Sequence, residues 1–449
     1  MKKYSGILLV FLFSLSVFAQ SDDELFGSDD DLFGDDGIEI VESVTADNDL
    51  SKGTLFEAGA IKIGGKFDTS LGTSTVLYSD DEEEDFGDYI KETAFEPKLS
   101  AFLTVDARPT DVLRMYTKLG IGYPFKDTAV TTKTLEPNPF VPDGYTEKYE
   151  TSSTNWFKMK EIFTDFSAAD RAFFRFGLHT VTWGTGYFFS PVSDIINATS
   201  INPEDVEAQV DGVVNLRTQI TFPDSQNCLW AYIIPSSVKA QETALAAKGD
   251  FVFGGWEIGL GGYYKYENAP KAILTASGSI KKFNIFGEFV YQYGGTSEWT
   301  QNTDWENKEH IVQATAGLSY TFKDPQITLA GQYYYDGNNK DFTHQYFTYG
   351  HNIAALVNFG KILGNTDLTA SVFGMVNFGK EELPELYALM INQMGMGSFI
   401  NTATFSASIS YTPFKNFKVS CGPYVTFAAW DDKPTVSLKI NAVLGGGKF

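Results

Sequence analysis

In several segments of the first half of the chain, charged or polar side chains alternate with apolar ones. For example, Phe174, Phe176 and Leu178 alternate with Arg175 and His179. Successive side chains of a β-strand point to opposite faces, so the two sets belong to opposite sides of one strand. The same parity gives the set that could do chemistry: Lys98, Arg114, Lys118, Glu161, Asp165, Arg175, His179, Trp183 and Arg217.

This mixed ladder of acidic and basic side chains has two interpretations. If it faces a water-filled passage, opposed charges create a transverse field that orients polar solutes. Alternatively, the charges neutralise one another and stiffen the wall of a narrow barrel, as polar side chains inside small barrels do. The two roles are compatible.

Covalent chemistry is not indicated. A hydrolase needs a nucleophile, a histidine and an orienting polar group together. His310, His344 and His351 are expected near loops without a nucleophile motif beside them, and His179 is expected to belong to the charged network. No spacing of His, Cys and carboxylates suggests a metal site. We therefore predict no enzyme activity, no cofactor and no metal.

The first nineteen residues have the layout of a secretory signal peptide. Lys2 and Lys3 precede the apolar run Ile7–Phe13, and small side chains at Val17 and Ala19 suit cleavage before Gln20. No later apolar run approaches the roughly 20 residues of a transmembrane helix. The exported chain is therefore expected to be either a soluble protein or a barrel.

Connection lengths and composition favour a transmembrane antiparallel up-and-down β-barrel over residues 51–449. The aromatic content of 15% suits girdles at the two membrane interfaces. Short connections alternate with mostly longer ones, which is typical of periplasmic turns and external loops. We count about eighteen strands, with sixteen within error, and an even count places both termini in the periplasm. The short connections lie near 108–111, 167–171, 223–227, 254–255, 281–282, 323–325, 361–365 and 413–415, and the long ones near 78–92, 125–154, 184–210, 236–245, 295–308, 337–347 and 379–400.

Much of the net charge of -23 lies in an N-terminal tail, residues 20–50. Residues 20–42 contain ten acidic residues and no basic one, within two near-copies of a seven-residue motif with a Leu-Phe pair. Such a segment is expected to be disordered in isolation, either as a solvated periplasmic tail or as a docking motif. Nucleic acid is an unexpected partner for this charge. Cys421 shares the apolar face, so a bridge to Cys228 is not expected.

The motif Arg-x-Gly-x-x-x-Val-x-Trp-Gly-x-Gly of residues 175–186 continues into Phe188-Phe189-Ser190-Pro191. It resembles bacterial outer-membrane porin-like families of uncertain substrate. The resemblance implies that the loop from about Gly184 to Val210 folds inward and narrows a channel. Its constriction candidates are Trp183, Gly184, Gly186 and Asp194. An ordinary external loop is the alternative.

The chain ends at Phe449, after a strand expected to end near Leu444. This end resembles outer-membrane barrels whose last strand finishes in an aromatic residue, which implies the barrel assembly machinery as a partner. The intervening glycines of residues 445–447 interrupt the apolar alternation. A short flexible end is therefore the alternative.

The function expected from these features is passive or selective diffusion of small polar solutes through a monomeric or oligomeric barrel in outer-membrane lipid. One alternative is a transporter of hydrophobic substrates resembling the fatty-acid channel family, although the acidic tail is an unsuitable plug for an apolar path. The other is a surface adhesin or interaction barrel whose long loops carry the binding.

Single-cysteine labelling tests this topology. With both native cysteines replaced by serine, a membrane-impermeant thiol reagent added to intact cells should reach cysteines placed at Thr146 and Glu382 in the external loops. It should not reach cysteines at Asp224 and Lys323 in the periplasmic turns, because the outer membrane separates them from the reagent. Labelling of either turn position in sealed cells would contradict the assignment.

Overall fold

The alternating segments of the sequence form long antiparallel strands. The computed structural model describes residues 56–78, 95–123, 128–137, 145–154, 156–169, 171–197, 212–223, 225–295, 309–339, 350–378, 401–428 and 433–448, with Thr93 and Phe125. The signal sequence, the acidic tail and Phe449 lie outside the described residues, so the expectations about them stay predictions.

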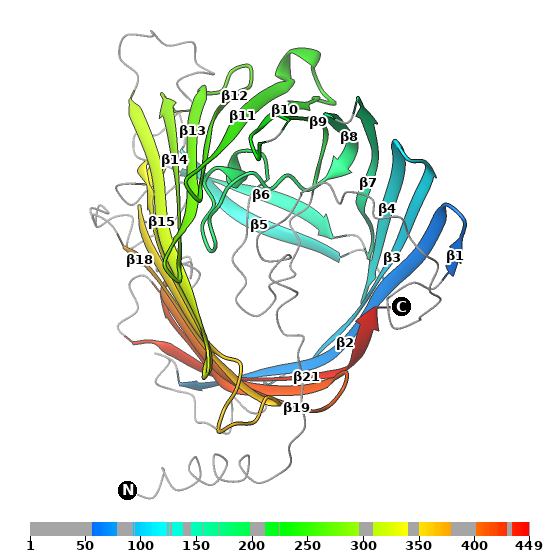
Figure 1. Ribbon diagram of the computed structural model, residues 1–449. Helices are drawn as coiled ribbons and strands as arrows, with labels where there is room; N and C mark the ends of the chain where they lie inside the picture. Colours follow the sequence, from blue (N-terminus) through cyan, green and yellow to red (C-terminus); the bar gives the residue numbers. More distant parts are fainter. Residues whose placement is uncertain are drawn as a thin grey trace, which may run out of the picture.

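One sheet of nineteen strands closes on itself, and all but the short β1 (Phe56–Ala58) belong to the closed ring of eighteen. Each strand pairs with the next in the ring, and the last pairs with the first (Figure 1). The expected up-and-down barrel is confirmed. The ring consists of β2 (Ile61–Tyr78), β3 (Phe95–Thr110), β4 (Leu113–Gly122), β7 (Phe157–Ala168), β8 (Ala172–His179), β9 (Val213–Thr221), β10 (Cys228–Ile234), β11 (Ala244–Phe253), β12 (Trp256–Tyr264), β13 (Lys271–Ile280), β14 (Phe283–Tyr293), β15 (His310–Lys323), β16 (Gln326–Asp336), β17 (His351–Phe359), β18 (Leu368–Phe378), β19 (Asn401–Phe414), β20 (Phe417–Ala428) and β21 (Thr435–Lys448).

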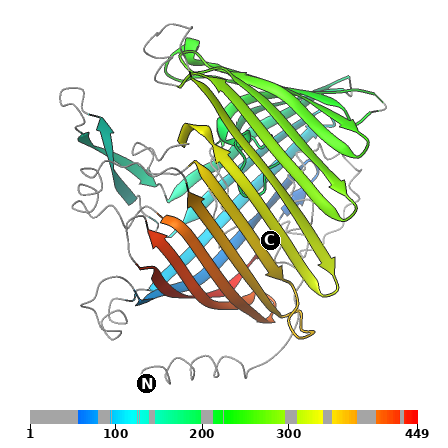
Figure 2. The ribbon, with the colours of Figure 1, turned by 90° about the vertical axis from the view of Figure 1, so that its left-hand side faces the viewer.

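The remaining elements are small. Strands β5 (Thr128–Pro137) and β6 (Tyr145–Thr154) form a separate hairpin that stands apart from the ring, at the left in Figure 2. Within the described residues, single turns of 3-10 helix are formed by η2 (Ser193–Ile195), η3 (Ala240–Glu242) and η5 (Gly337–Asn339). In the described part of the chain, no helix has the length and apolar character to cross a membrane.

The ring closes through a longer final strand than the sequence pattern suggested. Strand β21 continues past Leu444 to Lys448 and pairs with β2, Lys448 lying opposite Lys66. A register shift between Thr69 and Ser70 leaves Leu444 of β21 as an extra residue, and beyond it the glycine run continues the ladder with β2. The expected end near Leu444 was therefore too early, because the glycines pair through their backbones.

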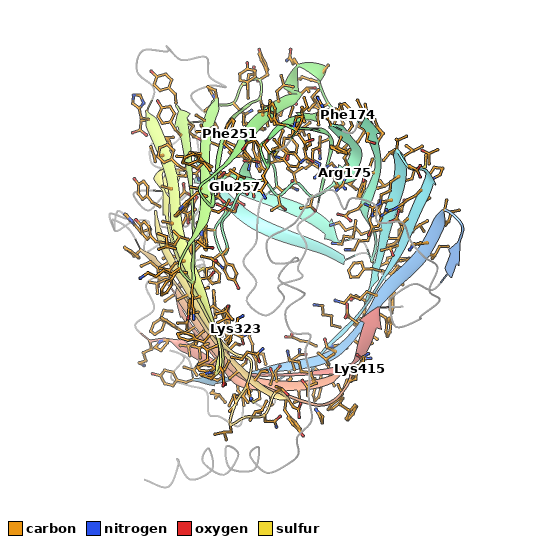
Figure 3. The ribbon with its side chains drawn as sticks, in the orientation of Figure 1. Phe174, Arg175, Phe251, Glu257, Lys323 and Lys415 are labelled. Carbon is orange, nitrogen blue, oxygen red and sulfur yellow. The ribbon has the colours of Figure 1, made fainter. Side chains whose placement is uncertain are left out.

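The two faces of the wall have the chemistry that parity predicted. Phe174 and Arg175 are neighbours on β8, and they point to opposite sides of the wall, Arg175 into the barrel (Figure 3). Outward apolar side chains such as Met115 and Phe176 are exposed, whereas inward polar side chains such as Glu288 are buried. Such a face can be in contact only with lipid in a transmembrane barrel. Both cysteines are free, Cys421 exposed and Cys228 buried.

The ring adds two connections that we did not recognise in the sequence. Residues 265–270 join β12 to β13, and residues 429–434 join β20 to β21. Both occupy positions where the alternation expects a long connection but are themselves short, so length alone could not identify them. Together with the eight expected turns and seven expected loops, they account for the seventeen connections of an eighteen-stranded ring.

Candidate functional site

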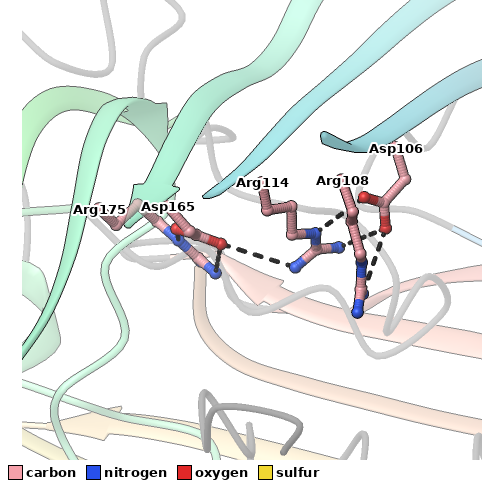
Figure 4. Close-up of polar contacts among 5 residues, drawn as sticks. All are labelled: Asp106, Arg108, Arg114, Asp165 and Arg175. Carbon is pink, nitrogen blue, oxygen red and sulfur yellow. Dashed lines mark hydrogen bonds and ion pairs between the residues drawn. The ribbon is translucent and has the colours of Figure 1, made fainter. Parts of the chain in front are cut away.

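A continuous chain of ion pairs runs along the inner wall across β3, β4, β7 and β8 (Figure 4). The Arg175 guanidinium donates to both carboxylate oxygens of Asp165, at 2.7 and 3.2 Å. Arg114 lies 3.6 Å from Asp165 and binds Asp106 in the same two-point manner, at 3.0 and 3.1 Å. Arg108 completes the chain at 3.5 Å from Asp106. We call these five residues the ion-pair chain.

Strand register places these side chains together. Arg114 lies directly opposite Asp165, and Asp165 lies directly opposite Arg175. Directly opposed residues have side chains close enough to pair. Phe163 supports the chain from the same inner face, its ring 4.0 Å from the Arg175 guanidinium carbon and stacked 5.1 Å from Tyr116. Planar guanidinium groups favour both contacts, the two-point carboxylate pair and the aromatic face.

The ion-pair chain is in contact with the lumen, since its side chains remain between 17% and 32% exposed. Its three arginines exceed its two aspartates by one charge. The ion-pair chain therefore carries a net positive charge, and each aspartate is neutralised locally.

The other predicted wall residues have different surroundings. Lys118 lies opposite Glu161 in register, and its ammonium group is 5.1 Å from the ring centre of Phe102. Arg217 is buried, with its guanidinium carbon 5.4 Å from the ring centre of Trp230. His179 is also buried, with its ring edge-on to an aromatic neighbour. Neither of these two belongs to the ion-pair chain. Lys98 is an inward residue of β3, opposite Ser70 of β2.

The segment of residues 180–197, which we call the lumen segment, leaves the wall and runs inside the ring (Figure 1). It begins at Thr180 and not near Gly184, because β8 ends at His179. Beyond that point the backbone bonds side chains of its own segment. Val181 N–H donates to Asn197 Oδ1 and Gly184 N–H donates to Ser193 Oγ. Trp183, expected on the strand, therefore lies in the lumen segment.

One carboxylate on the inner face of β14 holds the middle of this segment. Glu288 accepts N–H bonds from Thr185, Gly186 and Val192 at 2.5 to 2.8 Å, and the Ser190 hydroxyl donates to it at 2.9 Å. Glu288 is only 4% exposed. A buried carboxylate is costly unless its oxygens are hydrogen-bonded, and four donors meet this requirement.

Two further side chains of the wall bind the backbone of the lumen segment. Gln332 on β16 accepts from the N–H groups of Tyr187, Phe188 and Phe189 and donates back to the Phe189 carbonyl at 2.6 Å. Lys248 on β11 donates to the Trp183 carbonyl at 2.8 Å. Irregular backbone inside a barrel needs such partners because it has no neighbouring strand.

Apolar packing adds to these bonds. Val181, Trp183 and Val192 of the lumen segment form a buried cluster with Tyr232, Ala246, Ile273 and Val290 of the wall. The Trp183 indole N–H also donates to the Val192 carbonyl at 2.6 Å. The segment is therefore anchored as a small core against β10 to β14.

The lumen segment reaches far around the ring. It leaves from β8, and its Phe188 ring lies 5.8 Å from that of Phe373 on β18. A Cβ atom at Gly186 would collide with the Phe189 carbonyl, and one at Gly184 with Ser190 Oγ and Glu288. Both glycines are therefore required by close approach, more strictly than their flexibility alone suggested. The inward path is observed; that it narrows a conducting channel stays a prediction.

Asp194 is the charged residue of the lumen segment. It is exposed, on η2, and interacts electrostatically with Lys271 of β13 and Tyr334 of β16. A negative charge on the segment thus accompanies the positive excess of the ion-pair chain. Among the described residues, no group of three or more His, Cys, Asp or Glu side chains is arranged to hold a metal ion.

Sequence parity missed the residues that hold the lumen segment. The inward faces of their strands also carry other polar residues, such as Asp250 and Gln292, so parity alone does not single out Glu288, Gln332 and Lys248. A lone acid at the centre of residues 283–293 was the available signal for Glu288. Its partners, however, lie about a hundred positions earlier in the chain, so only the folded ring identifies them.

Solved structures that resemble this barrel are bacterial outer-membrane porins. OccK9 (OpdG) of Pseudomonas aeruginosa has 8% identity and a TM-score of 0.48, with 86% of this chain and 98% of that chain covered. A BenF-like porin of Pseudomonas fluorescens Pf-5 has 6% identity and a TM-score of 0.49, with coverage of 86% and 99%. A variant porin of Rhodopseudomonas blastica has 12% identity and a TM-score of 0.38, with coverage of 85% and 99%. No protein-family model and no curated protein sequence matches the chain.

Replacement of Glu288 should release the lumen segment. In Glu288→Gln, the amide NH₂ group replaces one acceptor oxygen and confronts N–H donors, so at least one hydrogen bond to a charged group is lost, at about 1.5–3 kcal/mol each. We expect a lower temperature of unfolding and larger current fluctuations in single-channel recordings. Glu257→Gln makes the same change at an inward position of β12 and serves as the control (Figure 3). Equal behaviour of the two variants would show that Glu288 does not hold the segment.

Proposed function

We propose that this protein is an outer-membrane channel through which small polar solutes diffuse. The observation that carries the proposal is the pairing of a charged inner wall with a segment that crosses the lumen opposite to it. A closed barrel with an apolar exterior belongs in a bilayer, and a polar, charged interior suits solutes that carry their own hydration. The proposed location is the outer membrane, with both termini in the periplasm.

The distribution of charge suggests how solutes are oriented. The ion-pair chain on β3 to β8 exposes a net positive charge, whereas the lumen segment exposes Asp194. Charges of opposite sign on two sides of a passage produce the transverse field expected from the sequence. We infer a preference for anions, or for solutes with a negatively charged end, along the arginine side.

The charged side chains of the inner wall are unfavourable for a hydrophobic substrate. An apolar solute near β3 to β8 would have to displace water from arginine and aspartate side chains without replacing their hydrogen bonds. The surface-interaction alternative keeps one supporting feature, the β5–β6 hairpin that stands apart from the ring (Figure 2). It is compatible with a channel, because the hairpin lies in a connection and not in the wall.

Neutralisation of the ion-pair chain should change ion selectivity. The double variant Arg114→Gln/Arg175→Gln removes two positive charges from the inner wall, so anions are attracted less and the permeability ratio shifts toward cations. At a distance of about 8 Å, a Coulomb energy of about 0.5 kcal/mol in water, reduced by screening, gives roughly a twofold shift for each charge. Reversal potentials across a salt gradient measure it.

A control variant and a stability measurement make this test specific. Lys323→Gln removes a charge at the β15–β16 turn, away from the ion-pair chain, and should leave the reversal potential unchanged (Figure 3). The double variant should also unfold at a lower temperature, because Asp106 and Asp165 lose their two-point partners. A folded double variant with an unchanged reversal potential would mean that the ion-pair chain only stiffens the wall.

A further inference from the structure

Two histidines on the outward face of the barrel are each hydrogen-bonded to a tyrosine of the preceding strand. His310 Nδ1 lies 2.7 Å from the Tyr291 hydroxyl, and His351 Nδ1 lies 2.7 Å from the Tyr333 hydroxyl. Neither pair touches the ion-pair chain or the lumen segment. We call them the two Tyr–His pairs.

The two Tyr–His pairs repeat one arrangement. His310 is directly opposite Tyr293, and His351 is directly opposite Tyr335, with ring centres 5.1 Å apart in both cases. The bonded tyrosine is in each case two residues earlier on the strand, with ring centres 5.9 and 6.1 Å from the histidine. The copies lie on the adjacent strand pairs β14–β15 and β16–β17, and they share no residue.

Their position is at one membrane interface. Each histidine is the first residue of its strand, β15 or β17, after one of the long connections. The side chains face outward, since Gln292 and Gln332 beside the tyrosines are buried on the inner side while Tyr333 is exposed. Aromatic side chains at this level of a barrel meet the lipid headgroups.

The chemistry of the pair suits an anionic oxygen. When the imidazole is protonated, both ring nitrogens are donors. The Nδ1–H then bonds the tyrosine oxygen, which fixes the ring, and the Nε2–H remains to meet an acceptor. A protonated imidazole carries a full positive charge. A headgroup phosphate offers several acceptor oxygens and the opposite charge.

We propose that the two Tyr–His pairs are duplicate binding sites for the phosphate group of a membrane lipid at this interface.

The described titratable groups around the two Tyr–His pairs are few. Tyr291 and Tyr293 face His310, Tyr333 and Tyr335 face His351, and Phe378 stacks on the other side of His351. Glu309 precedes His310 in the chain. The histidines are the basic side chains among these groups.

Native mass spectrometry of the full chain in an uncharged detergent tests the proposal, with phosphatidic acid as the probe. One cation near an anionic lipid changes binding about fivefold, so His310→Gln/His351→Gln should weaken binding by about that factor at each site. Diacylglycerol of the same acyl chains, which lacks the phosphate, should bind both proteins equally.

The tyrosines provide a matched pair of variants. Tyr291→Phe/Tyr333→Phe removes the hydroxyls that bond the imidazoles and should weaken phosphatidic acid binding. Tyr293→Phe/Tyr335→Phe makes the same change two residues along each strand and should not. Equal binding by the histidine variant and the unaltered chain, with the barrel still folded in gel electrophoresis, overturns the proposal. Displacement of the lipid by equimolar inorganic phosphate would instead identify free phosphate as the ligand and overturn the lipid assignment.

Discussion

The pairing of β21 with β2 is the constraint on which the rest of the structure depends. A bilayer offers no water to unpaired backbone groups, so a sheet that spans it must have no open edge. The glycines near the end of the chain and the register shift at Thr69 and Ser70 let the last strand meet the first along its length. Once the ring is closed, every strand has one face toward lipid and one toward the lumen.

Closure creates a second requirement inside the ring. The lumen segment has no strand beside it, yet its backbone groups are removed from bulk water. Glu288 and Gln332 accept seven hydrogen bonds, six from backbone N–H groups of the segment and one from the Ser190 hydroxyl. Both side chains come from wall strands that lie far from β8 around the ring. The lumen segment and the ion-pair chain therefore occupy different parts of the wall. Strands β14 and β16 hold the lumen segment, whereas β3, β4, β7 and β8 carry the ion pairs.

The outward face of the barrel is subject to a different constraint. The outward face must be apolar at the middle of the membrane, but its ends can carry polar groups where lipid headgroups begin. The two Tyr–His pairs lie at such ends, and their duplicated geometry on β14–β15 and β16–β17 distinguishes them from single aromatic anchors. The barrel thus has separate polar groups on its inner wall and at the outward ends of its strands.

The sequence by itself determined the class of fold, the number of strands within one hairpin and the inward and outward faces of strands such as β4 and β8, because a period of two is a local property of the chain. It also identified Arg114, Asp165 and Arg175 as inward residues. It could not determine partners. That Arg114 pairs with Asp106 and Asp165, that Arg217 is buried beside Trp230, and that Glu288 holds the lumen segment were decided by strand register and by which walls face one another across the lumen. These are relations between residues distant in sequence, and only the closed ring brings them within bonding distance.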